Sequence, residues 1–282
     1  MKISTSVLLV CLLFLTAPLK VVAQHLVSGF SQGKGKFAVA VSTTRENFVD
    51  FYLGDKKSSI TIRKLDKIVT QSINLYAAYG ITNKIDLIMN IPYIITQSHK
   101  LTDNQNVGEK NFQNGLLVIQ TKLLQKVDSI GVFSVTGGLG LSTPLSNYAT
   151  NLIYSIGNQS THVNPSLLVQ YKLANGLFIN GQGGYSFRSN TVPDAVLSAA
   201  KIGYGGKLFY VDGWINNQTS TSGIDIGGPG FTPERFPETK VNTTNLGVSI
   251  FVAGITLGGG KRLTGRNAGI PTYYTIGLAL SF

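Results

Sequence analysis

Residues 163–188 read VNPSLLVQYKLANGLFINGQGGYSFR, and they decide the fold of the chain. In the segments before and after Ala174-Asn175-Gly176, the odd-numbered residues are apolar, aromatic or glycine, and most even-numbered residues are polar. This period of two places alternate side chains on opposite faces of a β-strand. The linking tripeptide suits a tight hairpin because Asn and Gly tolerate a positive φ. The stretch therefore predicts two antiparallel strands, each with an apolar face and a polar face.

The same alternation recurs along the chain in segments of about ten residues, separated in turn by short turns and by longer polar stretches. The polar stretches fall at about 45–67, 96–110, 143–162, 189–195, 220–240 and 264–271. Short turns on one side and long loops on the other are typical of outer-membrane barrels, whose turns are periplasmic. Counting the segments predicts about twelve strands, with both chain ends in the periplasm. The count is least regular at 196–219, where Gly203, Gly205 and Gly206 obscure the turn.

The last segment carries the clearest pattern. The residues of its apolar face are Tyr274, Ile276, Leu278, Leu280 and the C-terminal Phe282. A terminal aromatic residue on an alternating strand is the usual signal for the bacterial barrel-assembly machinery, which we therefore expect as a partner. We also expect this strand to pair with the first, near 34–44, because an unpaired strand edge is not tolerated in lipid.

Composition supports a membrane barrel. Only 13% of the residues are charged, about half the usual share, yet no apolar run after residue 23 is long enough for a spanning helix. A secreted β-sandwich or jelly roll is the alternative, since it also alternates, but it needs more surface charge. We predict an all-β chain in which residues 24–282 form one antiparallel transmembrane barrel.

The N-terminus reads as a secretory signal. Lys2 precedes the apolar run Val7–Leu15, and the small residue Ala23 ends a cleavage-site pattern. An N-terminal membrane anchor is the alternative, although the run is too short to cross a bilayer. We predict a signal peptide at 1–23 and export to the outer membrane of a Gram-negative bacterium. Cys11, the only cysteine, lies within it, so the exported chain has neither a disulfide nor a cysteine nucleophile.

The chain is basic, with a formal charge of +11 that falls to +9 when Lys2 and Lys20 leave with the signal. Such a balance often indicates nucleic acid, but an exported protein does not meet it. Outer-membrane lipid and anionic solutes are the expected partners.

We expect no enzymatic activity, no cofactor and no metal. His25, His99 and His162 have no nearby nucleophile in a known catalytic pattern, and no Gly-x-Ser-x-Gly elbow occurs. The acidic residues of the 96–110 and 220–240 stretches do not follow the spacing of a calcium loop.

The polar faces of the strands predict the lining of the barrel. The residues that this reading places in the lumen are Lys36, Asp86, Asn90, Lys122, Lys172, Phe178, Asn180, Gln182, Arg188 and Lys201. Five are cations, against Asp86 and also Asp212, so an open lumen should prefer anions. Alternatively, these cations pair with carboxylates or fill a plugged interior. Lys261, Arg262 and Arg266, near the outer rim, are candidates for binding lipid phosphates.

Several motifs go beyond alternation. The chain contains an opening QGKGKF at 32–37, YAAYGITNKIDL at 76–87, NIPY at 90–93 and GKRLTGRN at 260–267. Together these resemble a family of outer-membrane transporters associated with the meta-pathway of phenol degradation, and the resemblance covers residues 24–282. It implies an outer-membrane barrel for small solutes, which are hydrophobic or aromatic, and it supplies no catalytic residues; the expectation of anionic solutes rests on the lumen cations instead. The alternative function is a closed barrel whose loops have a structural or adhesive role in the cell envelope.

Overall fold

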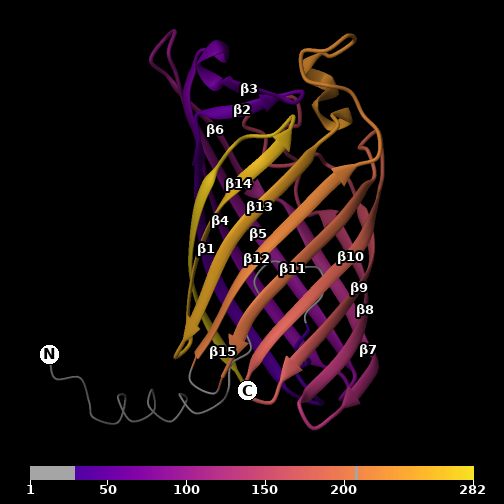
Figure 1. Ribbon diagram of the computed structural model, residues 1–282. Coiled ribbons are helices and arrows are strands. Elements are labelled where there is room, and N and C mark those ends of the chain that lie inside the picture. The colour runs from indigo at the N-terminus through magenta and orange to yellow at the C-terminus, as the bar shows by residue number, and fades with distance from the viewer. Residues whose placement is uncertain (1–28, 207–208) are drawn as a thin grey trace, which may run out of the picture.

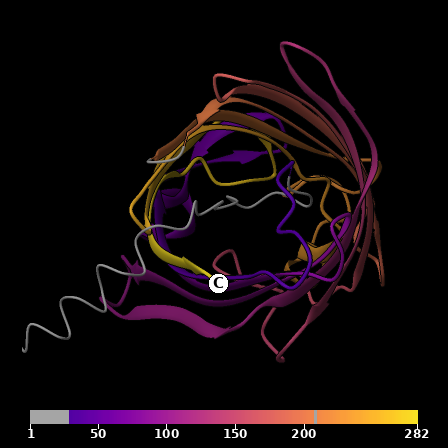
Figure 2. The same cartoon turned by 90° about the horizontal axis from the view of Figure 1, so that it is seen from below.

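Twelve antiparallel strands close into a barrel in the computed structural model, which describes residues 29–206 and 209–282. Figures 1 and 2 show the barrel from the side and along its axis. The strands, in chain order, are β1 (Phe37–Phe48), β4 (Leu65–Gly80), β5 (Ile85–Lys100), β7 (Asn114–Val127), β8 (Gly131–Pro144), β9 (His162–Leu173), β10 (Leu177–Arg188), β11 (Ala195–Gly205), β12 (Phe209–Ser220), β13 (Asn242–Val252), β14 (Ile255–Arg266) and β15 (Thr272–Ser281). The predicted class and strand number are confirmed. The predicted signal peptide lies outside the described residues.

The last strand closes the barrel against the first. β15 pairs with β1 over ten residues, from Ala38↔Ser281 to Asn47↔Thr272. At the rim the exchange is reciprocal: the Phe37 amide donates to the Phe282 carbonyl at 3.1 Å, and the Phe282 amide donates back at 2.8 Å. The predicted closure is therefore confirmed, and recognition by the assembly machinery stays a prediction.

One end of the barrel carries short turns, and the other carries long loops (Figure 1). The turn between β13 and β14 is only Ala253-Gly254, with φ of 48° and 85°. Positive φ at both positions is the hairpin geometry that matches the twist of the flanking strands. The irregular stretch 196–219 holds the two strands β11 and β12.

The long-loop end has secondary structure of its own. A hairpin of β2 (Asp50–Leu53) and β3 (Lys56–Ser59) leads to the short helix η2 (Ile60–Arg63), and the loop after β12 contains η3 (Pro233–Glu238). β6 (Asn106–Phe112) continues into β7 after Gln113, and both pair with β5. The stretches 45–67 and 96–110 were expected to be loops. They contain strand ends instead, because polar side chains do not interrupt a ladder that has left the membrane.

Side chains of the barrel are apolar outside and polar inside. Leu167, Ile179 and Leu278 are 47%, 57% and 65% exposed, whereas Gln120, Asn164 and Gln170 are at most 4% exposed. Every strand of the barrel has an apolar outer face, and a continuous apolar surface of this size is stable only when hydrocarbon surrounds it. This arrangement is the reverse of a β-sandwich, in which the apolar face is the buried one. No helix among the described residues is long and apolar enough to cross a membrane.

Glycines on the inner wall make room for aromatic rings. The inward residues Trp214, Gly247, Gly260 and Tyr273 are successive partners across β12 to β15. The rings of Trp214 and Tyr273 stack with centroids 6.1 Å apart. A Cβ on Gly247 would lie 2.4 Å from the Trp214 ring, and one on Gly260 would lie 2.6 Å from the Tyr273 hydroxyl oxygen. The two rings therefore occupy the space that a side chain at position 247 or 260 would need.

We predict that Gly247→Val destabilises the barrel by about 1–3 kcal/mol, because the new side chain displaces the Trp214 ring. The chain has one tryptophan, so its fluorescence during urea unfolding of the refolded protein reports this site directly. Gly213→Val is the matched control, since a Cβ at Gly213 meets no atom within 4 Å. Equal unfolding midpoints for the two variants would contradict the packing argument.

Candidate functional site

The long-loop end contains an apolar cavity of about 270 Å³ at the mouth of the barrel. Long loops mark the extracellular end of barrels of this kind. The cavity, here called the mouth pocket, is formed by residues 150–158 and 226–239, by Phe48 at the end of β1, by Phe51 of β2 and by the segment 267–269 that follows β14. Its apolar lining includes Phe48, Phe51, Ile153, Ile156, Ile226 and Phe236.

Loop 145–161 lies against the inner wall. The inward-facing Thr96 donates its hydroxyl to the Tyr154 carbonyl at 2.8 Å, and the Ala149 amide donates to the Glu109 carboxylate at 2.6 Å. Tyr148 packs with Ile94 and Ile156 in a buried cluster, and its hydroxyl donates to the Asn114 side-chain oxygen at 2.7 Å. The loop thus narrows the lumen at the mouth.

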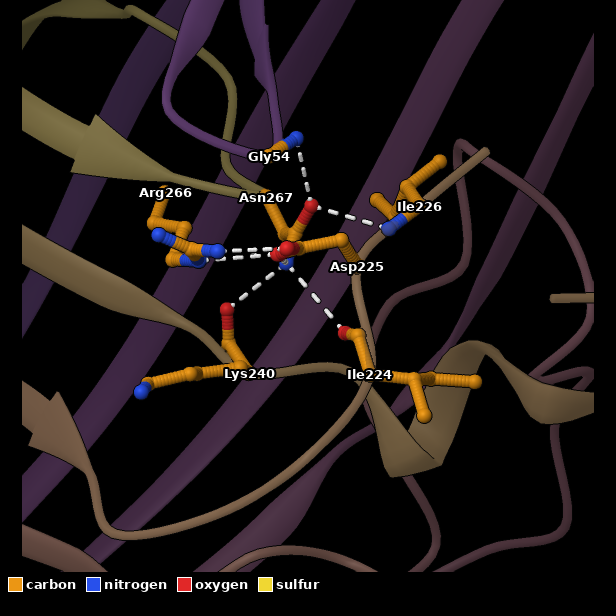
Figure 3. A network of polar contacts seen from close by, with 7 residues as sticks. All are labelled: Gly54, Ile224, Asp225, Ile226, Lys240, Arg266 and Asn267. Carbon is orange, nitrogen blue, oxygen red and sulfur yellow. Dashed lines mark hydrogen bonds and ion pairs between the residues drawn. The ribbon is translucent and has the colours of Figure 1, made fainter. Parts of the chain in front are cut away.

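Loop 221–241 is fastened by Asn267, which follows β14 (Figure 3). The Asn267 side-chain oxygen accepts from the amides of Gly54 and Ile226, at 2.8 and 3.0 Å. Its side-chain nitrogen donates to the Lys240 carbonyl at 2.8 Å and to the Asp225 carboxylate at 2.9 Å. One amide therefore connects the β2–β3 hairpin, both ends of this loop and the end of β14.

Asp225 and Arg266 complete this connection with a two-pronged ion pair. The Arg266 Nε lies 2.8 Å from Asp225 Oδ1, and its Nη2 contacts Oδ2. The hydrogen bonds from Arg266, together with that from Asn267, hold the pKa of Asp225 below its ordinary value. A lowered pKa means that the pair stabilises the loop at neutral pH, and that this stabilisation is lost as the pH falls through the lowered pKa.

Residues Gly29–Gln32 enter the opposite end of the lumen. The Phe30 ring lies edge-on to Phe178 and Tyr210, with centroids 5.4 and 6.1 Å away, and the Lys172 ammonium lies 5.4 Å from its centre. The backbone is held on both sides: the Gln32 amide donates to Asp86 at 3.3 Å, and Gln170 donates to the Gly29 carbonyl at 3.0 Å. This segment therefore occupies part of the lumen at the short-turn end.

Two carboxylates of the lumen are engaged by neighbours. Lys201 pairs with Asp212 at 3.1 Å, with side chains 8% and 0% exposed, and Tyr210 donates its hydroxyl to Asp212 at 2.6 Å. Asp86 accepts from the Gln120 side-chain nitrogen at 3.0 Å. The charge of Lys201 is thus offset, which weakens its contribution to anion attraction.

The remaining residues predicted to line the lumen are spread along it. Asn180 donates to Gln170 at 3.3 Å, and the Arg188 Nε donates to Ser186 at 3.1 Å. Lys36 is exposed at the rim, one residue before β1. Asn90, Lys122 and Gln182 face the lumen by strand register. Their partners on the neighbouring strands are Tyr76, Thr136 and Leu168, which lie on the inner face.

Of the three rim cations proposed to bind lipid, only Lys261 faces outward. Arg262 pairs with the inward-facing Asn245, and Arg266 is turned to Asp225 of loop 221–241. The Arg262 Nε donates to Asn245 at 3.0 Å and its Nη1 donates to the Gly269 carbonyl at 2.7 Å, both at the mouth. Sequence reasoning also missed Phe30 and Tyr210, which no motif marks, and the role of Asn267, although this residue ends the GKRLTGRN motif.

Two of the three histidines lie in the described part of the chain. The ring nitrogens of His99 lie 3.1 and 2.8 Å from the side-chain oxygens of Asn106 and Asn104. His162 lies at the start of β9, and His25 falls outside the described residues. No group of three or more His, Cys, Asp or Glu residues with metal-binding geometry occurs in the described part of the chain.

Comparison with known proteins supports the fold. The chain is similar to the COG4313 outer membrane channel from Pseudomonas putida F1, with 13% identity and a TM-score of 0.67 over 92% of this chain and 100% of that one. The KdgM porin aligns at 13% identity and a TM-score of 0.47, over 86% of this chain and 99% of that one, and this weaker likeness carries no argument. No family model and no curated protein matches the chain. At this identity, the first likeness shows that the chain has the fold of an outer-membrane barrel.

We predict that Asp225→Asn speeds amide hydrogen exchange in loop 221–241 roughly fivefold at neutral pH, because a partly exposed ion pair contributes about 1 kcal/mol. The difference should vanish at acidic pH, where the wild-type carboxyl is also protonated. Hydrogen exchange followed by mass spectrometry measures both effects.

The control for this variant is Asp103→Asn, which removes the same charge from a longer, exposed pair with Lys100, 3.7 Å away. Equal protection of loop 221–241 in wild type and Asp225→Asn at neutral pH would show that the ion pair does not fasten the loop.

Proposed function

We propose that this chain is a bacterial outer-membrane channel for small solutes. The observation that carries the proposal is an apolar pocket of about 270 Å³ at the mouth of a closed barrel whose inner wall is polar. An apolar or aromatic group finds contacts in the mouth pocket, and polar side chains below it replace water around a small solute. The resemblance to transporters of the phenol-degradation type agrees with this class of solute.

We further propose a preference for anions within this class. Lys122 and Lys172 face the lumen and form no ion pair with a carboxylate among the described residues. Charges in a narrow lumen are less screened than on an open surface, so these two cations raise the local concentration of anions.

Single-channel recording of refolded residues 24–282 in planar bilayers, under a salt gradient, tests the proposal. We expect discrete conductance steps and a reversal potential of the sign for anions. Lys122→Gln together with Lys172→Gln should move the reversal potential toward zero. The pair Lys84→Gln and Lys126→Gln removes the same charge outside the lumen and should leave it unchanged.

A closed barrel with structural or adhesive loops is the second candidate. It is favoured by the two segments that enter the lumen from opposite ends, loop 145–161 and Gly29–Gln32. Absence of any conductance from correctly folded protein would reject the channel and favour this candidate.

The segment Gly29–Gln32 provides a separate prediction. A chain that begins at Gly33 should conduct more than residues 24–282, because the short-turn end of the lumen loses its occupant. Phe30→Ala should give an intermediate conductance, since it removes the ring packed on Phe178 and Tyr210. Phe187→Ala, on the outward face, is the control. Unchanged conductance in the shortened chain would show that the segment does not restrict flow.

A further inference from the structure

The outer wall carries its charge on one side only. By strand register, the outward positions of the described strands β8 to β13 hold no charged residue. Neighbouring strands on the opposite wall, from β14 through β15, β1, β4 and β5 to β6, hold four outward cations near the long-loop end. These are Arg45, Lys67, Lys110 and Lys261, all exposed.

These cations begin where the aromatic residues end. Tyr93 on β5 and Phe112 on β6 are outward partners whose rings lie 5.1 Å apart. The next outward pair toward the loops is Ile95↔Lys110, and Arg45 is the partner of the outward Tyr274. Aromatic rings mark the boundary between hydrocarbon and headgroups in membrane barrels. Two residues of strand advance about 7 Å, so the cations lie at the level of the headgroups.

Three of the four cations line one groove of about 540 Å³ on this wall. Arg45, Lys67 and Lys110 come from three strands, and His99 and Gln97 add polar groups between them. Asp66 is the exposed carboxylate of the groove. Glu109 also reaches it, but its carboxylate accepts from the Ala149 amide of the loop inside the barrel. The groove therefore has an excess of positive charge facing the bilayer.

We propose that this groove binds the phosphate groups of an anionic lipid headgroup in the outer leaflet. Arg and Lys provide the charged donors that phosphate oxygens prefer, and the neighbouring aromatic residues hold the groove at the depth where those phosphates lie. A solute in the lumen does not reach the groove, because it lies on the outside of the wall. The proposal rests on the long-loop end facing the outer leaflet, and it is independent of conduction.

The experiment measures binding of lipid A that carries two phosphates to refolded residues 24–282 in detergent micelles, by native mass spectrometry. Each cation near a charged surface contributes roughly fivefold to affinity, so Arg45→Gln with Lys67→Gln and Lys110→Gln should weaken binding roughly a hundredfold. The control variant is Lys34→Gln with Lys84→Gln and Lys126→Gln, which removes the same charge at the short-turn end. The control should bind like the wild type.

Two further ligands separate the sources of phosphate. Dephosphorylated lipid A should bind weakly and equally to all three proteins, and inorganic phosphate alone should not match the affinity of the intact lipid. Equal loss of binding in the two triple variants would reduce the effect to net charge and overturn the proposal. Inorganic phosphate binding as tightly as the lipid would overturn the assignment to a lipid headgroup.

Discussion

The pairing of every backbone amide and carbonyl within hydrocarbon is the constraint on which the rest of the molecule depends. An open sheet would leave a row of these groups unpaired in lipid at each of its two edges, at a cost of several kcal/mol for each group. The pairing of β1 with β15 over ten residues, with the reciprocal bonds between Phe37 and Phe282, removes both edges. Because this closing pair is antiparallel, as every other pair in the barrel is, the number of strands is even, and alternate connections lie at opposite ends. Closure also divides every strand into a lipid face and a lumen face.

The lumen face then has to be filled or solvated without a conventional core. Polar side chains bond to one another across neighbouring strands, as Asn180 does to Gln170 and Gln120 does to Asp86. Aromatic rings lie against glycines of the wall, as Trp214 does against Gly247, so large side chains are accommodated without extending toward the barrel axis. Segments without regular structure narrow both ends: Phe30 at the short turns and loop 145–161 at the mouth. The residues of the outer wall also match their surroundings. Apolar residues face the hydrocarbon, aromatic residues lie at its boundary, and cations lie at the level of the headgroups.

The features that the sequence predicts are those that depend on a local period of two. Alternation from Val163 to Arg188 and at Tyr274 to Phe282 was sufficient for the fold class and the closing pair, and the strand number followed from counting such segments along the whole chain. The same parity places Phe178 and Asn180 on the inner face, although their role in solute passage stays a prediction.

Other features depend on contacts between distant irregular segments, which no period reveals. Asn267 joins Gly54 to Ile226, and Phe30 meets Tyr210, through contacts far apart in sequence. Register shifts at Leu65/Ile68 and Lys122/Leu124 also change which residues face outward, so parity counted through them fails. Arg262 and Arg266 show the same limit, because their partners at the mouth are visible only once the loops are in place.

Thiol labelling tests the inside-out arrangement most directly, since residues 24–282 contain no cysteine. Two single-cysteine variants are compared in barrels reconstituted into vesicles: Asn180→Cys, on the lumen face, and Ile179→Cys, on the lipid face. A small water-soluble maleimide should label the cysteine at 180 and leave the one at 179 unmodified, whereas a lipid-soluble maleimide should label 179. Equal labelling of both positions by the water-soluble reagent would contradict a closed barrel with a polar lumen and an apolar wall in lipid.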